Sequence, residues 1–322
     1  VMLTSVSTDN IATNVELLRN QATIRQFTAM ILLIGIAWIL SHILVRPFDR
    51  VTTAIREIND GFNTEQISVS DYVETEHIVN AFNELLGRMR TLDESRQEFV
   101  SNVSHELKTP ITSMKVLADS LISQENVPIE LYKEFMTDIA EEIERENKII
   151  TDLLSLVKMD KTSANLNIEN RNLNELIELI LKRLRPIAKQ RNIDVLYESA
   201  REVFAEIDEV KLTLAISNLV ENAIKYNKEY GYVKVSLDAD HQFATIMVED
   251  NGIGIPEEAQ EHIFERFYRV DKSHSREIGG TGLGLAIARN AILLHRGSIK
   301  IDSEEGQGTV FTVKIPIIYV SK

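Results

Sequence analysis

Residues 99–110 read FVSNVSHELKTP, and this stretch decides how the N-terminal half of the chain folds. On a helix with about 100° per residue, its apolar side chains and those of the following turns form a single stripe. The members of the stripe are Phe99, Val103, Leu107, Met114, Leu117 and Leu121, with Ile111 at its margin. His105 falls almost opposite, so the sequence predicts a long amphipathic helix that exposes a histidine.

The surroundings of His105 favour a chemical role, although a lone helical histidine is usually just solvated. Glu106 is its neighbour, and Thr109 lies one turn further along the same face. Pro110 cannot donate an N–H to the carbonyl of Glu106, so it should bend the helix just past the histidine. An exposed imidazole beside a carboxylate suits a nucleophile.

Residues 105–110, HELKTP, resemble the phosphoacceptor box of the bacterial sensor histidine kinases of two-component systems. The resemblance implies that a ring nitrogen of His105 attacks the γ-phosphoryl of ATP, while Glu106 orients the imidazole and takes its proton. It also implies that the phosphoryl group passes to an aspartate on a separate response regulator. Glu106 and Thr109 match the family's phosphatase pattern, so dephosphorylation of that regulator is expected as a second activity.

The composition of the chain limits its partners. The 322 residues carry a net charge of −14 without a basic block, which argues against binding of nucleic acid. Cysteine is absent, so disulfides and thiolate metal sites are excluded. Any anionic ligand must therefore be held by a local site.

Residues 27–45, FTAMILLIGIAWILSHILV, form an apolar run. About 19 residues in a helix cross the roughly 30 Å hydrocarbon layer, so we expect one transmembrane span. A buried core helix is the alternative, but the run has no polar face. Trp38 and His42 would lie toward the interface, and three arginines follow the span: Arg46, Arg50 and Arg56. Their charge favours a cytoplasmic location for the C-terminal side. The family resemblance implies that the membrane is a bacterial cell membrane and that the kinase domains lie in the cytoplasm.

The segments on either side of this span have separate expected roles. Residues 1–26 should be the membrane-proximal end of an extracytoplasmic helix, left from a truncated sensor region. Residues 46–97 are predicted as helix, polar connector and helix, and they resemble a HAMP relay with Pro47 and Glu76 at the family's positions. Pro47 should open the first helix and Gly61 should mark its break. A plain coiled linker is the alternative.

Residues 98–160 are predicted to form a dimerising hairpin. Its first helix begins near Glu74, upstream of the hairpin, and ends near Ile122, and a polar loop over residues 123–128 reverses the chain. The return helix carries apolar residues at helical spacing: Phe135, Ile139, Ile143, Ile150, Leu153 and Val157. Each helix has only one apolar stripe, so we expect two copies to pair into a dimeric four-helix bundle.

The C-terminal half has the pattern of an α/β sandwich. Residues 161–170 are a polar linker, and residues 171–322 alternate helical segments with strand-like runs. Four runs show period-two alternation: Val233–Leu237, Ala244–Val248, Ser298–Asp302 and Thr309–Ile315. A mixed sheet covered by helices fits this pattern.

A helix predicted over residues 208–227 carries a polar ridge opposite its buried stripe of Leu212, Ile216, Leu219 and Ala223. Asn218, Asn222 and Lys225 lie on this ridge at positions i, i+4 and i+7. Two amides and an ammonium on one ridge can hold a metal–phosphate group. Taken alone, such a ridge is more often ordinary polar surface.

Residues 218–226, NLVENAIKY, are similar to the asparagine box of the same kinases. The resemblance implies that Asn218 and Asn222 bind Mg²⁺, a hard cation that prefers oxygen ligands. It assigns to Glu221 the polarisation of a metal-bound water. It also places Tyr226, the last residue of the box, at the nucleotide.

Two glycine-containing segments complete the predicted nucleotide site. Residues 250–256, DNGIGIP, follow a strand, so Asp250 can accept a hydrogen bond from an adenine amino group. Gly252 and Gly254 allow the backbone to approach the ring, although an acidic turn is the alternative. Residues 280–285, GTGLGL, open a helix whose bare N–H groups suit a polyphosphate. The polyphosphate contacts are assigned to Gly280, Thr281, Gly282, Leu283 and Gly284. This spacing fits neither a P-loop nor a dinucleotide fold.

Residues 264–269, FERFYR, and the polar stretch Lys272 to Glu277 look like the family's phenylalanine box and mobile lid. Arg269 could neutralise charge on the transferred phosphoryl group, because phosphoryl transfer depends mainly on positioning and electrostatics. For Arg266, a structural role is the alternative to such a catalytic one.

These boxes occur in the family's order. They imply a membrane-anchored, homodimeric sensor histidine kinase whose Bergerat-type domain binds ATP and Mg²⁺. Two alternatives stay open. One is an ATP-driven conformational machine, because gyrase and heat-shock chaperone ATPases share the nucleotide boxes. The other is a membrane signalling scaffold that binds ATP without transferring phosphate.

Overall fold

The computed structural model describes residues 8–59, 73–123, 127–161, 166–270 and 280–319. The predicted break at Gly61 and the lid residues Lys272 to Glu277 lie outside these ranges. The chain divides into two compact units, Val1–Glu98 and Phe99–Lys322.

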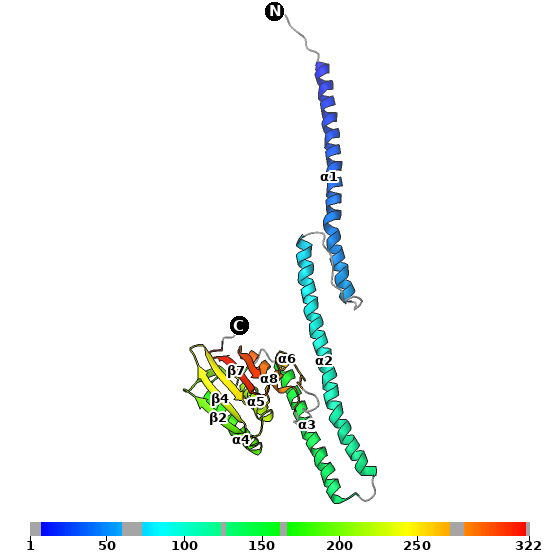
Figure 1. Ribbon diagram of the computed structural model, residues 1–322. Coiled ribbons are helices and arrows are strands. Elements are labelled where there is room, and N and C mark those ends of the chain that lie inside the picture. The colour runs from blue at the N-terminus through cyan, green and yellow to red at the C-terminus, as the bar shows by residue number, and fades with distance from the viewer. Residues whose placement is uncertain (1–7, 60–72, 124–126, 162–165, 271–279, 320–322) are drawn as a thin grey trace, which may run out of the picture. The chain divides into compact units, whose positions relative to one another are not determined.

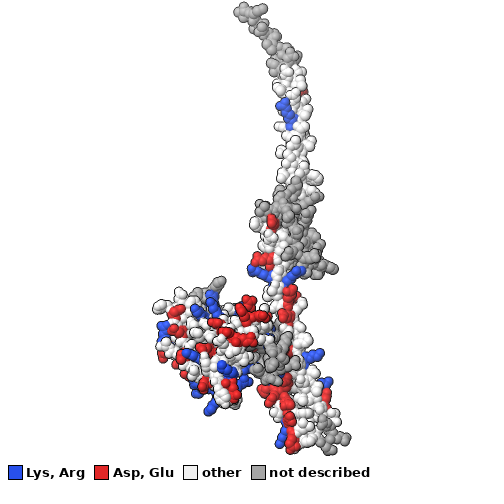
Figure 2. All heavy atoms as spheres, viewed as in Figure 1, with Lys and Arg blue, Asp and Glu red and all other residues white. Residues whose placement is uncertain are grey.

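The first unit contains helix α1 (Thr8–Asn59), which is longer than the sequence predicted. The expectation that a new helix opens at Pro47 is wrong, because α1 runs through this residue. Proline keeps a helical φ and removes a single backbone hydrogen bond, which a helix of 52 residues tolerates. Within α1, Thr13–His42 is long and apolar enough to cross a membrane, by length and composition (Figure 2). The rings of Trp38 and His42 stack there, with centroids 5.7 Å apart.

Helix α2 (Val73–Ser123) confirms the first predicted stripe. The residues of the stripe on one face are half-buried: Phe99, Val103, Leu107, Met114, Leu117 and Leu121. His105 is exposed, as expected, and Ile111 at the margin of the stripe is exposed too. The helix continues through Pro110, and the hydroxyl of Thr109 donates to the carbonyl of His105 at 3.1 Å.

Helix α3 (Ile129–Lys161) returns antiparallel to α2, as Figure 1 shows. In the single chain, Phe135, Ile139 and Leu153 of its predicted stripe are half-buried, whereas Ile143, Ile150 and Val157 are exposed. The buried residues of α3 are instead Ile149, Leu156 and Met159. The helix has two apolar faces, and the buried one packs toward helix α8 (Gly284–Leu294) of the same chain.

The remaining elements form the expected α/β sandwich, shown in Figure 1. In chain order they are β1 (Glu169–Asn172), α4 (Leu173–Gln190), β2 (Asp194–Ser199), β3 (Phe204–Ile207), α5 (Glu209–Lys225), β4 (Tyr232–Ala239), β5 (Phe243–Asp250), α6 (Glu257–Gln260), α8, β6 (Ser298–Glu304) and β7 (Gly308–Pro316). Strand β1 begins inside the segment predicted as a linker.

The main sheet has the order β2-β4-β5-β7-β6, and β1 pairs with β3 in a separate small sheet. Only β2 and β4 run parallel in the main sheet, so it is mixed, as predicted. Alternate residues of β4, β5 and β7 are buried against the helices. All four strands expected from period-two alternation are confirmed.

The N-terminus of α5 is fixed by a buried polar cluster. Asp208 caps the helix, accepting from the backbone N–H of Lys211 at 3.1 Å and from its ammonium at 2.6 Å. Burial alone would raise the pKa of Asp208, but these hydrogen bonds and one from Asn167 hold it below its usual range. The backbone N–H of Asp208 donates to Nε2 of the buried His295 at 2.9 Å. The cluster therefore ties the start of α5 to the end of α8.

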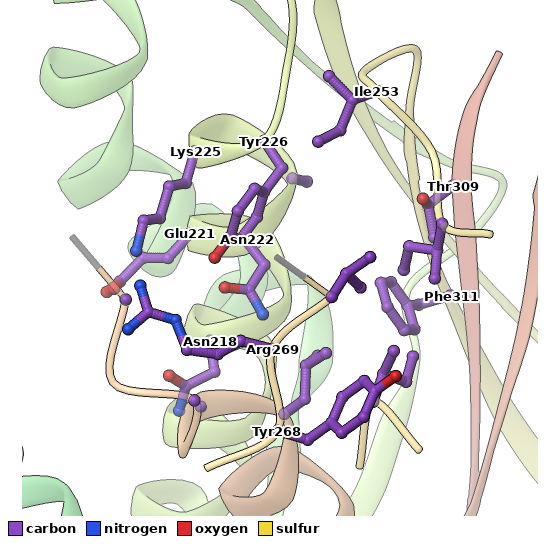
Figure 3. Close-up of a pocket in the computed structure, with 18 of the residues that line it drawn as sticks. Asn218, Glu221, Asn222, Lys225, Tyr226, Ile253, Tyr268, Arg269, Thr309 and Phe311 are labelled. Atoms are coloured by element: carbon purple, nitrogen blue, oxygen red, sulfur yellow. The ribbon is translucent and has the colours of Figure 1, made fainter. Parts of the chain in front are cut away.

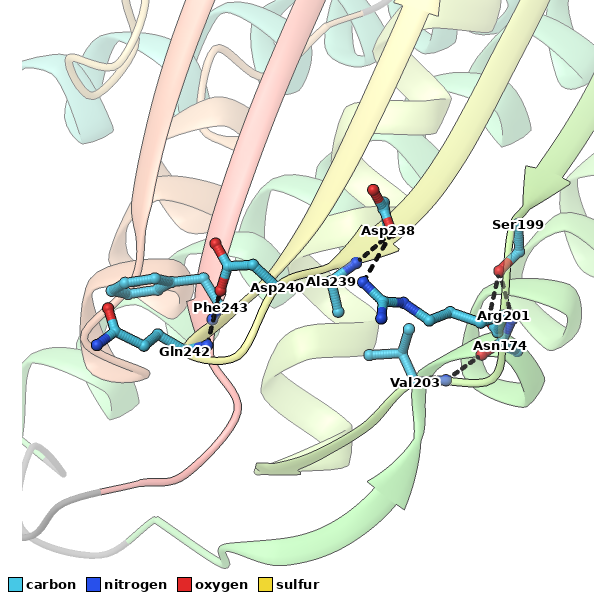
Figure 4. Close-up of polar contacts among 9 residues, drawn as sticks. All are labelled: Asn174, Ser199, Arg201, Val203, Asp238, Ala239, Asp240, Gln242 and Phe243. Carbon is cyan, nitrogen blue, oxygen red and sulfur yellow. Dashed lines mark hydrogen bonds and ion pairs between the residues drawn. The ribbon is translucent and has the colours of Figure 1, made fainter.

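Polar side chains also order the turns at one end of the sheet (Figure 4). Asn174 of α4 donates to the hydroxyl of Ser199 at 2.7 Å and accepts from the backbone N–H of Val203 at 2.8 Å. Asp240 accepts from two backbone N–H groups in the turn between β4 and β5. These bonds satisfy backbone groups that would otherwise be unpaired between strands.

Candidate functional site

A pocket of about 540 Å³ lies along the polar ridge of α5 (Figure 3). It is closed by the loop after β5, the glycine segment 280–284, strand β7 and helix α3. Most residues predicted for the site line it: Asn218, Glu221, Asn222, Lys225, Tyr226, Asp250, Gly254, Arg269, Gly280, Thr281, Gly282 and Gly284. The structure thus brings together three motifs that are far apart in the sequence.

Gly252 and Leu283 are predicted contacts that do not line the pocket. A Cβ at Gly252 would lie 2.3 Å from the carbonyl oxygen of Tyr226, so this glycine lets the loop after β5 pack on the end of α5. The side chain of Leu283 is fully buried in the core, and its N–H donates to the Thr281 hydroxyl at 3.3 Å. Both residues thus position the segments that form the pocket without lining it themselves.

One end of the pocket collects groups suited to phosphate and metal. The side-chain N–H₂ of Asn218 donates to the carbonyl of Leu214 at 3.0 Å, and its Oδ1 lies 2.9 Å from the position of a Cβ on Gly284. The ammonium of Lys225 lies 2.9 Å from the position of a Cβ on Gly280. The ridge of α5 therefore faces the glycine segment. It places the amide oxygen of Asn218 and the ammonium of Lys225 beside glycine backbone that no side chain covers.

Lys225 is held among other cations. Burial first, and then the charges of Lys148 and Arg269, lower the pKa of Lys225 to about 8, while Glu221 opposes the shift. Figure 3 shows the side chains of Lys225 and Arg269 extending toward Glu221. About nine tenths of Lys225 is charged at pH 7 with such a pKa. The pocket therefore gathers positive charge locally, although the chain as a whole is acidic.

The other end is apolar around one carboxylate. Asp250 is 9% exposed, and burial raises its pKa to about 6. Its Oδ1 accepts from the backbone N–H of Gly252 at 2.9 Å. The walls here include residues that the sequence reasoning missed: Ile263, Tyr268, Thr309 and Phe311. The period-two alternation of β7 could be recognised in the sequence, but no polar motif indicated that these residues line a pocket. A flat base with an amino group fits this end.

Two residues of α3, Lys148 and Asp152, also line the pocket. The ammonium of Lys148 lies 3.1 Å from Oε2 of Glu221, and the hydroxyl of Thr281 donates to Asp152 at 3.0 Å. Burial raises the pKa of Asp152. Sequence reasoning gave α3 no part in this site, because the partners of Lys148 and Asp152 are distant in the sequence.

The phenylalanine box contacts α2. The ring of Phe99 lies 6.0 Å from that of Phe267 and 5.2 Å from the guanidinium of Arg266. Phe267 adopts φ +64°, and its N–H donates to the carbonyl of Gly282 at 2.9 Å. Arg266 does not line the pocket, which favours its structural alternative, whereas Arg269 does.

His105 does not line the pocket. Within the described residues, Lys148 and Asp152 are the pocket's only contributions from the two hairpin helices. The structure thus keeps the exposed histidine and the nucleotide-shaped pocket apart.

Comparison with known proteins gives matches to two domain models. Residues 95–162 match the His Kinase A (phospho-acceptor) domain, and residues 207–318 match the Histidine kinase-, DNA gyrase B-, and HSP90-like ATPase family. The sensor histidine kinase WalK of Bacillus subtilis is 38% identical over 228 residues, 70% of this chain and 37% of the relative. A WalK of Staphylococcus aureus is 36% identical over 278 residues, 81% of this chain and 66% of the relative. The chain spans little more than a third of the B. subtilis relative's length.

Solved structures agree with these matches. The histidine kinase AdeS of Acinetobacter baumannii aligns with a TM-score of 0.54 at 25% identity, over 66% of this chain and 98% of that chain. The histidine kinase ThkA, in complex with the response regulator protein TrrA, aligns with a TM-score of 0.58 at 27% identity, over 71% of this chain and 64% of that chain. With both domain models matched in order, the chain belongs to the family of bacterial two-component sensor histidine kinases, and its C-terminal domain is an ATP-binding domain.

Proposed function

We propose that this chain is the signalling core of a sensor histidine kinase, which phosphorylates His105 from ATP·Mg²⁺ and passes the phosphoryl group to an aspartate of a response regulator. The observation that carries the proposal is the pairing, in one compact unit, of an exposed histidine on α2 with the pocket on α5. The complex of ThkA with TrrA supports a response regulator as partner.

The two ends of the pocket suit the two parts of ATP. Asp250 accepts the adenine amino group against the apolar wall, and the glycine segment 280–284 offers backbone N–H groups to the phosphates. Lys225 and Arg269 supply positive charge beside them, where charge on the transferred phosphoryl group needs neutralising.

The donor set at the phosphate end fits Mg²⁺. Asn218 and Asn222 offer amide oxygens and Glu221 a carboxylate, all hard ligands. The anchored side-chain N–H₂ of Asn218 leaves its oxygen as the ligand atom. Bound there, Mg²⁺ would neutralise phosphate charge and orient the polyphosphate.

On the hairpin, His105 is the nucleophile and Glu106 orients its ring and takes its proton. Thr109 bonds the carbonyl of His105 in this structure, so it lies at the phosphoacceptor turn. There its hydroxyl can hold a water against the phosphorylated regulator, which would give phosphatase activity.

We also propose the predicted organisation: an extracytoplasmic, membrane-proximal helix end (1–26), a transmembrane helix (27–45), a HAMP relay (46–97), a dimerising hairpin (98–160), a linker (161–170) and a cytoplasmic catalytic domain (171–322). The apolar α1 supports anchoring in the bacterial cell membrane. The exposed face of α3 at Ile143, Ile150 and Val157 supports a homodimer, because their spacing of seven residues suits a helix partner.

The test is incubation of the full chain in lipid nanodiscs with γ-labelled ATP and Mg²⁺. We expect acid-labile, alkali-stable label on the wild type, loss of label with His105→Gln, and no loss with His77→Gln, an exposed histidine on the same helix. ATP hydrolysis that leaves no label and survives His105→Gln would establish the conformational ATPase instead. ATP binding with neither label nor hydrolysis would establish the scaffold.

A further inference from the structure

Two charged side chains of α3 enter the nucleotide pocket, although α3 belongs to the hairpin that carries His105. Lys148 pairs with Glu221 at 3.1 Å, and Asp152 accepts from the Thr281 hydroxyl at 3.0 Å. The ATP-binding domain supplies the ridge, the glycines and the apolar wall from its own elements. The α3 contacts are therefore additions to a site that is complete without them.

Both contacts occupy groups that the proposed ATP site needs. Glu221 is assigned to the metal, and an ammonium beside it opposes a divalent cation. Thr281 lies in the glycine segment, where a carboxylate opposes a polyphosphate. Asp152 lies largely out of water, so salt and solvent screen its repulsion less than at an exposed site. The charge of Asp152 thus has the sign that disfavours a polyphosphate, whereas Lys148 competes with the metal ion for Glu221.

Packed apolar residues hold α3 at the pocket. Ile149, which follows Lys148, and Leu156, one turn after Asp152, are 2% and 0% exposed. Leu156 and Met159 belong to the same hydrophobic core as α5 and α8. On the other helix of the hairpin, Phe99 contacts Phe267, whose N–H is bonded to Gly282. Helix α3 therefore contacts the glycine segment directly, and α2 contacts Phe267, which is hydrogen-bonded to that segment.

We propose that Lys148 and Asp152 form an electrostatic latch that closes the phosphate end of the pocket and that Mg·ATP opens. The proposal rests on the proposed function in taking Mg·ATP as the ligand. Since coupling between two sites is reciprocal, a ligand that opens the latch binds more tightly when the latch is weakened. Opening removes the two charged contacts that join the ATP-binding domain to α3 and leaves only the apolar packing of α3 to hold it. His105 does not line the pocket, so a weaker hold favours the movement that brings the pocket to His105.

The first test measures binding of a non-hydrolysable ATP analogue with Mg²⁺ to the full chain in nanodiscs. Asp152→Asn keeps an oxygen that can accept from Thr281 but removes the charge, and Lys148→Met removes the ammonium. We expect each variant to bind about tenfold more tightly, within the usual range of such couplings. The matched controls Asp138→Asn and Lys133→Met, exposed positions on α3 outside the pocket, should bind as the wild type does.

Weaker binding by Lys148→Met would make Lys148 a phosphate ligand and overturn the latch. Equal binding by the wild type and both variants would overturn it too. Absence of analogue binding in every protein, variants included, would instead contradict the proposed function. The two failures are therefore distinguishable.

A second test observes the latch directly, using spin labels on cysteines at Glu141 of α3 and Lys300 of β6. Both positions are exposed, and the chain has no other cysteine to take a label. The distance distribution of the wild type should change when the analogue and Mg²⁺ are added. The Lys148→Met, Asp152→Asn double variant should show the changed distribution without nucleotide. A distribution that nucleotide does not alter would overturn the proposal.

Discussion

At the scale of single residues, Asp250 shows how burial prepares a group for recognition. Withdrawal from water raises its pKa to about 6, and backbone N–H groups of Gly252 and Thr309 offset only part of that rise. The folded chain therefore holds this proton more tightly than the unfolded chain. The resulting stabilisation is full below about pH 4 and is lost as the pH rises through about 6.

Adenine binding should depend on this ionisation. Above pH 6 the Asp250 carboxylate is charged and accepts from the adenine amino group, so adenosine affinity should fall about tenfold between pH 7 and pH 5. Adenosine is the right probe because it has no phosphate that titrates in this range. NMR titration of the wild type and Asp250→Asn measures it. The variant should show weak binding with little pH dependence, and an equally steep profile in the variant would disprove the assignment.

At the scale of elements, the start of α5 depends on the Asp208 cap. This helix carries Asn218, Asn222 and Lys225, so its position sets the ridge of the pocket. The cap joins Lys211, Asn167 and His295 from three parts of the chain. A helix N-cap of this kind typically contributes about 1 kcal/mol, and up to about 2 kcal/mol.

Asp208→Ala should lower the opening free energy of the α5 amides by about 1–2 kcal/mol. Asp208→Asn should cost less, because asparagine is an equally good cap but loses the charged pair with Lys211. Amide hydrogen exchange on the full chain measures both, with the exposed Asp194→Ala as control. If alanine and asparagine proved equally costly, the charge and not the cap would dominate.

The sequence predicted the elements where one pattern controls one environment. The alternation in β4, β5 and β7 and the apolar stripe of α5 each mark a single buried face, the alternation in β6 marks a half-buried face, and each prediction is confirmed. Helix α3 has two apolar faces, and one periodicity could not assign them. The prediction of a helix start at Pro47 was wrong because a long helix tolerates the loss of the one backbone hydrogen bond that a proline removes. Lys148 and Asp152 escaped because their partners lie 73 and 129 residues away in the chain.

At the scale of the whole molecule, the unpartnered face of α3 predicts the oligomeric state. Ile143 and Ile150 are 46% and 43% exposed at a seven-residue spacing. Replacing both with glutamate would put two charges into the proposed dimer interface, where a buried unpaired charge is very costly. We expect at least a hundredfold weaker association in crosslinking of membrane-embedded chains. Leu179→Glu, at an exposed apolar position on α4, should leave the dimer intact. Unchanged association in the double variant would place the interface elsewhere.

The strand order of the main sheet has a consequence for the life of a bound nucleotide. Strands β5 and β7 are neighbours inside the sheet, and they carry Asp250, Thr309 and Phe311 at the end of the pocket that we propose for the base. Interior strands of a sheet are the last parts of a domain to open, whereas loops open readily. The base would thus be bound by the most stable part of the domain, whereas the glycine segment that would contact the phosphates is a loop that opens more readily. We therefore expect the product nucleotide to release its phosphates first and its adenine base last.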